Sequence, residues 1–406
     1  MPASHSPSRR LRLVADENMP GVEACCALLS PGVGIEVTRL PGRHLRAADV
    51  RDADILLVRS ITRVDAGLLT GSRVRFVGTA TIGTDHLDLT WLEAQGIAWA
   101  SAPGCNARAV GEWVLAVLCA LAAEQGVALA GRTLGIVGLG HVGRWSARLA
   151  ALAGLRVIAC DPFLSAADLP ADLAHIPLLP LDALLAEADA VSIHTPLTHG
   201  GPHPTHHLFD AARLDALRPG AWLINAARGP VIDNAALSAR LARGGITAVL
   251  DVWEHEPRVD AGLLAQVCLG SPHIAGHSLE GKWRGTWQIM AAAAEALGLR
   301  LDGALAGILP DVGGQALTLP AVAGASAEQR LAGLLAEVID QRGDDARLRA
   351  SLSEPDPAAA FDRLRKQYPV RREFPAHQIR VAADDPLRPL LGELGFVLSA
   401  SPASAR

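Results

Sequence analysis

Short apolar runs alternate with amphipathic stretches over most of the chain. In its central part the apolar runs cover residues 133–137, 155–159, 190–193, 221–225 and 246–250. Short apolar runs of this kind, bounded by turn residues, are typical of strands buried on both faces of a sheet. The stretches between them are long enough for helices, and strands that alternate with helices indicate a parallel sheet covered on both sides. We therefore predict an α/β fold with a doubly wound, Rossmann-type central domain.

The two ends of the chain repeat this pattern on a smaller scale. Near the N-terminus, strands are predicted at residues 11–15, 55–58 and 74–77, separated by polar or helical stretches. Beyond Gly281 an alanine- and leucine-rich helix is predicted to about Arg300, followed by a glycine- and proline-containing linker over 302–325. Residues 326–406 contain two predicted helices and at least one strand, at 378–382. This is enough for a third, small α/β domain.

Composition narrows the class of protein. With 406 residues, half of them hydrophobic, the chain is too long for one ordinary core and too apolar for wholesale disorder. A net charge of -5 gives no global basis for binding nucleic acid or an anionic membrane. The six cysteines form no C-x-x-C pair, the longest apolar run (113–123) is too short to span a bilayer, and residues 1–10 do not resemble a signal peptide. We expect a cytoplasmic protein that acts on small molecules.

A glycine-rich turn predicts a dinucleotide site. It follows the strand predicted at 133–137 and precedes a helix predicted over 144–153, an arrangement that places a pyrophosphate at a helix N-terminus. The turn residues expected to bind the cofactor are Gly138, Gly140, His141, Val142 and Gly143. Asp161, at the end of the next strand, can bind ribose hydroxyls and would repel a 2′-phosphate. The sequence therefore favours NAD over NADP.

Three residues after successive strands of this domain could carry out acid/base chemistry. Arg228 can hold a carboxylate, His273 can move a proton near neutral pH, and Glu256 can orient that histidine. Taken singly, each has a simpler interpretation: a surface ion pair, a hydrogen-bonded loop histidine or a solvated loop carboxylate. Together they fit oxidation of a 2-hydroxy acid, with these three as the catalytic residues.

Two further clusters favour simpler interpretations. Five histidines fall within 14 residues: His194, His199, His203, His206 and His207. Their segment contains glycines and prolines and is therefore predicted to be a loop with no histidine pair on a helix, so we expect no metal site there. The basic residues at 363–366 and 371–372 could contact nucleic acid, but such a run is more often a solvated face or a subunit contact.

With these residues identified, the chain resembles the D-isomer-specific 2-hydroxyacid dehydrogenases, and within them the erythronate-4-phosphate dehydrogenase branch. The matching segments are spread over almost the whole chain: 15–20 (ADENMP), 58–60 (VRS), 76–81 (FVGTAT), 83–86 (GTDH), 102–106 (APGCN), 272–276 (PHIAG), 279–282 (LEGK) and 361–366 (FDRLRK). Several of them are absent from other 2-hydroxyacid dehydrogenases, so the resemblance is specific.

The resemblance also implies site residues and domain boundaries. Catalytic roles fall on Arg228, Glu256 and His273. Further NAD contacts fall on Thr195, Ala226, Ala227, Arg228, Asp251 and Gly276. Substrate contacts fall on Ser60, Thr81 and His277, the last standing where the family often has tyrosine. The implied domains are a discontinuous flavodoxin-like substrate domain (1–105, completed by 278–300), an NAD domain (106–277) and a C-terminal dimerisation domain (301–406).

The activity implied by the resemblance is NAD-dependent oxidation of 4-phospho-D-erythronate in pyridoxal 5′-phosphate (vitamin B6) biosynthesis, by a homodimer. Two alternatives stay open at this point. One is a dehydrogenase of another phosphorylated 2-hydroxy acid, such as 3-phosphoglycerate. The other is a corepressor-type protein that uses the same fold to sense NAD(H) without catalysis. Formate dehydrogenases are disfavoured because they pair the histidine with glutamine, and this chain has Glu256.

Overall fold

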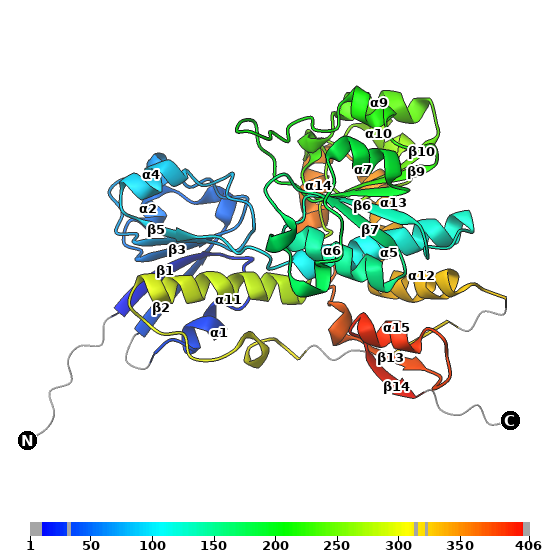
Figure 1. Cartoon of the computed structure of the whole chain (residues 1–406). Coiled ribbons are helices and arrows are strands. Elements are labelled where there is room, and N and C mark those ends of the chain that lie inside the picture. Colours follow the sequence, from blue (N-terminus) through cyan, green and yellow to red (C-terminus); the bar gives the residue numbers. More distant parts are fainter. Residues whose placement is uncertain (1–9, 31–33, 312–315, 321–323, 401–406) are drawn as a thin grey trace, which may run out of the picture. The chain divides into compact units, whose positions relative to one another are not determined.

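The chain forms two compact units in a computed structural model that describes residues 10–30, 34–311, 316–320 and 324–400 (Figure 1). The first unit consists of residues 1–106 and 279–312, and the second of residues 107–278 and 313–406. The first nine residues, which we do not expect to form a signal peptide, lie outside the described residues. Part of the predicted linker does so as well. The predicted separate C-terminal domain (301–406) stays a prediction.

The first unit is built on a five-stranded parallel sheet. Its strands are β1 (Arg10–Asp16), β2 (Gly34–Leu40), β3 (Ile55–Val58), β4 (Phe76–Thr79) and β5 (Ala98–Ala100). Their order, β2-β1-β3-β4-β5, is the flavodoxin-like order that the sequence predicted. The strand predicted at 74–77 begins two residues later, at Phe76. Neither β2 nor β5 was predicted, because β2 is a half-exposed edge strand with charged residues and β5 is very short.

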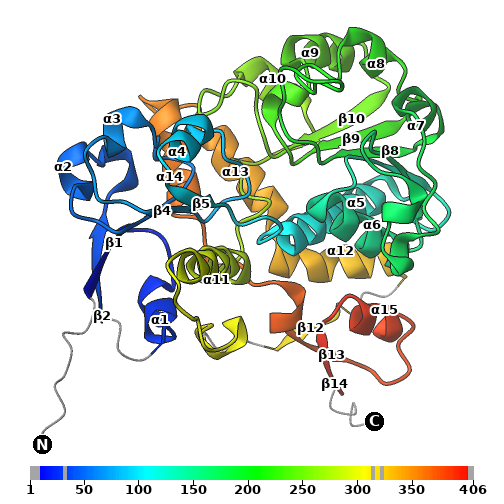
Figure 2. The same cartoon turned by 60° about the vertical axis from the view of Figure 1, so that its left-hand side comes forward.

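Helices cover both faces of this sheet (Figure 2). They are α1 (Val22–Ala27), α2 (Ala47–Val50), α3 (Ala66–Leu69), α4 (Leu89–Ala94) and α11 (Leu279–Ala296). Ile289 and Met290 of α11 share one apolar cluster with Val22 of α1, whereas α2, α3 and α4 contribute to the cluster on the opposite face. The long helix α11 thus belongs to the same compact unit as the N-terminal residues.

The second unit contains a six-stranded parallel sheet. Its strands are β6 (Thr133–Val137), β7 (Arg156–Cys160), β8 (Ala190–Ile193), β9 (Ala221–Asn225), β10 (Ile246–Leu250) and β11 (Leu269–Gly270), in the order β11-β10-β9-β8-β6-β7. The predicted central strands are confirmed, with β7 shifted by one residue. After β7 the chain crosses to the other side of β6 to form β8. This is a topological switch point, where doubly wound folds bind their ligands.

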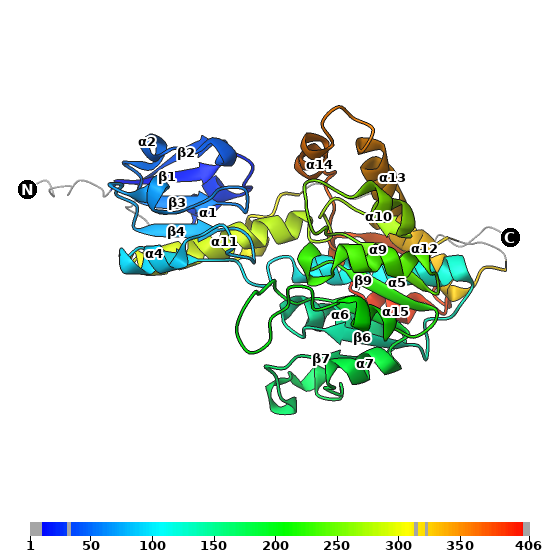
Figure 3. The same cartoon turned by 90° about the horizontal axis from the view of Figure 1, so that it is seen from above.

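Helices pack on this sheet (Figure 3), and two apolar clusters lie between them and its strands. The helices are α5 (Ala107–Gln125), α6 (His141–Leu152), α7 (Leu181–Glu187), α8 (Ala211–Asp215), α9 (Asn234–Ala242) and α10 (Ala261–Gln266). Helices α5 and α6 belong to one cluster, and α7 to α10 belong to the other. The apolar run at 113–123 is therefore a buried core helix. No helix in the described part of the chain combines the length and apolarity that a membrane span requires.

The C-terminal segment adds more helix than expected. It forms α12 (Ala327–Val338), α13 (Gln341–Ser351), α14 (Pro357–Lys366) and α15 (Arg388–Glu393), with the small parallel sheet β12 (Leu317–Thr318), β13 (Gln378–Val381) and β14 (Val397–Ala400). The prediction of two helices was therefore wrong. Leu331 and Leu335 of α12 share the buried cluster of α5, so this segment completes the core beside the dinucleotide fold.

Candidate active site

The glycine turn has the local geometry of a phosphate-binding turn. Gly138 has a φ of +91°, which only glycine adopts without strain, and a Cβ on Gly143 would lie 2.1 Å from the carbonyl oxygen of Gly138. A Cβ on Gly140, in contrast, would have no atom within 4 Å. The first and third glycines therefore allow the turn and the close approach of strand and helix, while the second leaves room for a ligand. The helix begins at His141, three residues before the predicted start.

Asp161 lies beside this turn and comes directly after β7. Its Oδ2 accepts a hydrogen bond from the backbone N–H of Leu139 (2.9 Å), and its Oδ1 accepts one from Phe163 (3.1 Å). These two bonds fix the carboxylate beside the glycine turn. Each oxygen keeps lone-pair capacity to accept a hydroxyl. The fixed charge supports the preference for a ribose with free hydroxyls over a 2′-phosphate.

Replacing Asp161 with alanine is expected to weaken NAD binding by about 10–100-fold, since hydrogen bonds to a charged group contribute about 1.5–3 kcal/mol. The variant should also discriminate less against NADP. Asp161→Asn is the matched control, because its amide oxygen still accepts the Leu139 bond. Calorimetric titration of each variant with NAD and NADP gives both values. A wild-type chain that already prefers NADP would contradict the assignment.

Backbone contact joins the loops that carry Arg228 and Glu256. The side chain of Asn225, at the end of β9, accepts from the N–H of Ala227 (3.0 Å) and donates to the carbonyl of Arg228 (3.0 Å). A Cβ on Gly229 would lie 2.0 Å from the carbonyl carbon of Trp253. Glycine at this position therefore allows the loop after β9 to lie directly against the loop after β10. The loops that follow these two neighbouring strands therefore meet at one edge of the sheet.

His273 and Glu256 form a hydrogen-bonded pair. The distance from His273 Nδ1 to Glu256 Oε1 is 2.7 Å, and both side chains are about one quarter exposed. Because Nδ1 is bound to the carboxylate, Nε2 is the nitrogen available for proton exchange with a ligand. The arrangement is that of a proton-transferring histidine oriented by a carboxylate.

Asp251 holds the loop that carries His273. Its buried carboxylate accepts hydrogen bonds from the hydroxyl of Ser271 (2.6 Å) and from the N–H groups of Ile274 (2.7 Å) and Ala275 (3.0 Å). The N–H of His273 donates to the backbone oxygen of Asp251 (2.7 Å). His273 has a φ of +58°, a conformation that is uncommon outside glycine and requires such support. The predicted contact of Asp251 with NAD stays a prediction.

The environment of Glu256 keeps it ionised. Burial by itself would raise its pKa, but the charge and hydrogen bond of His273 and the charge of Arg365 outweigh burial and lower the pKa below its usual range. Arg365 lies on α14, in the basic run for which the sequence favoured a solvated face or a subunit contact. The C-terminal segment thus contributes to the electrostatics of the His273–Glu256 pair.

Other residues of the C-terminal segment also contact the loop of His273. Arg371 is buried and donates to the carbonyl oxygen of Ala275 (2.6 Å), so a solvated face is the wrong interpretation for this arginine. The ring of Tyr368, the single tyrosine of the chain, lies edge-on to His277 at 5.8 Å between centroids, and its hydroxyl donates to Asp344 (3.0 Å). Sequence reasoning missed these residues because nothing in their spacing links them to position 273.

The predicted substrate residues Ser60 and Thr81 lie in the first unit, after β3 and β4. The Thr81 hydroxyl is 2.7 Å from that of Thr79 and also donates to the carbonyl of Gly83 (3.1 Å), whereas Ser60 is exposed. Next to Ser60, Arg59 forms an ion pair with the buried carboxylate of Asp16 (3.1 Å). The charge of Arg59 is therefore already compensated inside the protein.

Comparisons with known proteins agree with this geometry. Residues 106–275 match the family described as D-isomer specific 2-hydroxyacid dehydrogenase, NAD binding domain, and residues 313–395 match a domain of unknown function. Erythronate-4-phosphate dehydrogenases from Pseudomonas putida and Azotobacter vinelandii are 50% and 48% identical to this chain, over 95% of it and 99% of their own length.

Solved structures show the same fold. A Thermus thermophilus protein superimposes with a TM-score of 0.61 at 30% identity, covering 71% of this chain and 97% of its own. A D-lactate dehydrogenase from Aquifex aeolicus, solved with NAD and lactic acid, has a TM-score of 0.57 at 23% identity, covering 71% and 96%.

The fold and the comparisons define an NAD-dependent oxidoreductase. The chain belongs to the D-isomer-specific 2-hydroxyacid dehydrogenase family and, within it, to the erythronate-4-phosphate dehydrogenases.

Proposed function

We propose that this chain oxidises 4-phospho-D-erythronate to (R)-3-hydroxy-2-oxo-4-phosphooxybutanoate, as a step of pyridoxal 5′-phosphate biosynthesis in the cytoplasm. The observation that carries the proposal is the 2.7 Å bond between His273 and Glu256 in the unit that holds the glycine turn. The names and the near-complete coverage of the curated relatives support the substrate.

The residues have the following proposed roles. Arg228 binds the C1 carboxylate and the oxygen that becomes the carbonyl, and His273 Nε2 accepts the C2 hydroxyl proton. Glu256 keeps the imidazole oriented and stabilises its positive charge. NAD, when bound, would supply the acceptor for the hydride that C2 loses. Its contacts are proposed at the glycine turn (Gly138, Gly140, His141, Val142 and Gly143) and at Asp161, Thr195, Ala226, Ala227, Arg228, Asp251 and Gly276; substrate contacts are proposed at Ser60, Thr81 and His277.

An assay of NADH absorbance with a panel of phosphorylated and unphosphorylated 2-hydroxy acids tests the activity. The proposal expects 4-phospho-D-erythronate to be the preferred substrate. Faster turnover of 3-phosphoglycerate would instead indicate a dehydrogenase of another phosphorylated acid. NAD binding with no turnover of any acid would indicate a sensing protein.

Replacing Glu256 with glutamine is expected to move the acidic limb of the pH–rate profile for oxidation to lower pH. A neutral amide stabilises a protonated imidazole less than a carboxylate does, so the histidine loses its extra proton at a lower pH. In the wild-type chain the charge and hydrogen bond of His273 and the charge of Arg365 keep the pKa of Glu256 below its usual range, so that this residue is ionised. The measurement is kcat/KM between about pH 5 and 9, the range around the ordinary histidine titration.

Arg365→Gln is the companion variant for this prediction. It removes one charge that lowers the pKa of Glu256 and leaves the bond to His273 in place. We expect its acidic limb not to move to lower pH, because the carboxylate beside His273 is kept and the loss of a nearby positive charge does not disfavour a protonated imidazole. An acidic limb that stays unchanged in Glu256→Gln would show that the two residues are not coupled.

The chain is also expected to be a homodimer held by its C-terminal segment. Val370 and Val397 in this segment are 73% and 53% exposed, unusual values for large apolar side chains, and Val397 lies on the edge strand β14. Light scattering on the full chain should give about twice its mass of 42.4 kDa. Removing the segment is a poor test, since it would uncover the buried face of α5.

Point variants test the same surface without truncation. Val397→Asp should shift the scattering mass toward that of one chain. Phe163→Asp is the control, because Phe163 is equally apolar and 70% exposed but belongs to the loop after β7. A wild-type chain that scatters as a monomer would contradict the proposed dimer.

A further inference from the structure

The chain has a second histidine–glutamate pair, His207 with Glu254, in addition to His273 with Glu256. Among the described residues, two that are not glycine have a positive φ, and both are histidines: His207 (+50°) and His273 (+58°). Each histidine is hydrogen-bonded to a glutamate of the loop after β10. His207 Nε2 lies 2.5 Å from Glu254 Oε1, and His273 is bonded to Glu256. The proposed dehydrogenase chemistry uses His273 and Glu256 and leaves the pair of His207 and Glu254 without a role.

Both members of this second pair are held in place by backbone bonds. The N–H of His207 donates to the carbonyl of Pro230 (2.8 Å). Two residues later, the backbone of Phe209 is hydrogen-bonded to Val231. Glu254 Oε2 accepts from the N–H of Asn234 at the start of α9 (3.0 Å). A positive φ in a histidine costs free energy, and such strained residues gather at functional sites. The two side chains are therefore pre-positioned rather than loosely placed on the surface.

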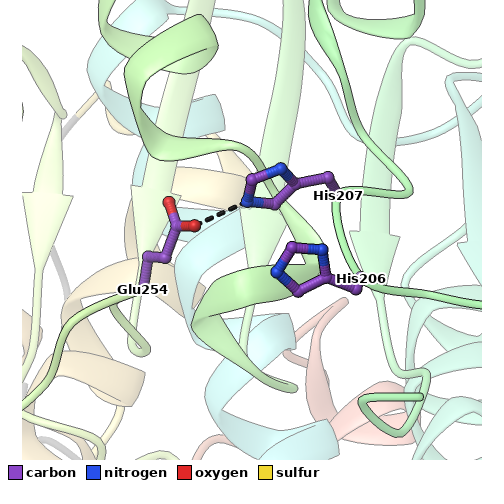
Figure 4. Close-up of side chains that lie close together, drawn as sticks. All are labelled: His206, His207 and Glu254. Atoms are coloured by element: carbon purple, nitrogen blue, oxygen red, sulfur yellow. Dashed lines mark hydrogen bonds and ion pairs between the residues drawn. The ribbon is translucent and has the colours of Figure 1, made fainter. Parts of the chain in front are cut away.

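His206 adds a third ligand atom to the pair. Its ring stacks on that of His207 at 4.0 Å between centroids, and the side chain is exposed (Figure 4). One nitrogen of each histidine and a carboxylate oxygen of Glu254 all lie within 4.8 Å of one another. Figure 4 shows the two rings one above the other, with the Glu254 carboxylate reaching the His207 ring from the neighbouring loop.

We propose that His206, His207 and Glu254 form a binding site for a divalent d-block cation, with Zn²⁺ as the best match. Two imidazoles and one carboxylate are a ligand set that zinc uses in proteins, and imidazole favours such metals over Mg²⁺ or Ca²⁺. Zn²⁺ bound at His207 Nε2 and Glu254 would replace the proton now shared between these two atoms.

The geometry requires two adjustments, since the 2.5 Å between His207 Nε2 and Glu254 Oε1 must open by roughly 0.8 Å and the widest separation of the ligand atoms must close. Ligand bonds of about 2.0–2.1 Å in a tetrahedral site place the ligand atoms about 3.3 Å apart. The present separation of up to 4.8 Å must therefore close by roughly 1.5 Å, which rotation of the exposed His206 side chain can supply. The ring of His199 lies 4.7 Å from that of His206, so His199 or water could complete the coordination.

This site differs from what the sequence predicted for the histidine-rich loop. The loop by itself lacks a rigid ligand frame, and the missing element is Glu254, which lies 47 residues after His207. A metal at this position would tie the loop after β8 to the loop that carries Glu256. We therefore expect Zn²⁺ to raise the melting temperature of the full chain, and binding to weaken as the pH falls, because the ligands must be deprotonated.

Titration of the EDTA-treated, tag-free full chain with Zn²⁺ against a chromophoric zinc indicator tests the site. The expected result is one Zn²⁺ per chain with a dissociation constant of about 10 μM or lower. His206→Asn should weaken binding at least about tenfold, because it removes one of three protein ligands. It keeps the bond between His207 and Glu254, so its melting temperature without metal should match the wild type.

His203→Asn is the matched control. His203 belongs to the same loop but its ring packs against Phe163 instead, so this variant should bind Zn²⁺ like the wild type. Absence of Zn²⁺ binding at about 100 μM metal would overturn the proposal. Equal affinities of the His206 and His203 variants would also overturn it, since the bound metal would then lie elsewhere, for example on a cysteine thiolate.

Discussion

Replacing His273 with asparagine is expected to lower kcat by about 10²–10⁴-fold, the usual effect of removing a general base. Its bond to Glu256 and its partly exposed ring support the proposal that His273 is the proton acceptor. Asparagine tolerates the left-handed backbone conformation that this position requires, with a φ of +58°. The variant should therefore keep the loop intact and lose only the proton transfer.

NAD binding is the control for this variant. The glycine turn and Asp161 make no hydrogen bond to His273 among the described residues, so calorimetric titration should give a dissociation constant for NAD close to that of the wild type. Loss of turnover together with loss of NAD binding would point to a folding defect. Turnover near the wild-type value would remove His273 from the mechanism.

Unphosphorylated D-erythronate is expected to be oxidised with a kcat/KM at least about 10³-fold below that of 4-phospho-D-erythronate. A site built to bind a phosphate is left with unpaired polar groups when the substrate lacks it, and such sites discriminate strongly. Comparing the two acids under identical conditions measures this ratio. Equal efficiency on both would make the chain a general 2-hydroxyacid dehydrogenase and contradict the proposed substrate.

The structure refines the choice of residue for the phosphate. Phosphate recognition normally uses arginine or lysine, which makes Arg59, Arg43 and Lys282 the candidates, and the guanidinium of Arg59 is already paired with buried Asp16. Removing Arg59 would leave a buried carboxylate without its partner, which typically costs about 3–5 kcal/mol of stability. Arg43 and Lys282 have exposed side chains, so alanine variants at these positions are the better tests. One of them should lower kcat/KM for the phosphorylated acid alone.

Much of the fold follows from the sequence because its signals are local. The buried parallel strands are short apolar runs, and the glycines at 138 and 143 are required by backbone geometry at a single turn. The candidates Arg228, Glu256 and His273 could be chosen because each follows a strand, and parallel strands end at one edge of their sheet. The structure places the side chains of two of them, His273 and Glu256, in contact with each other.

The tertiary structure decided the features that depend on contacts between distant segments. Arg365, Tyr368 and Arg371 lie about 100 residues after the loops that they influence, and their spacing carries no signal of that contact. The same holds for Glu254 beside His207 and for Asp16 beside Arg59. Periodicity and turn residues report how a segment folds locally. Which charges face one another is set by the packing of whole elements, which no single segment of the sequence records.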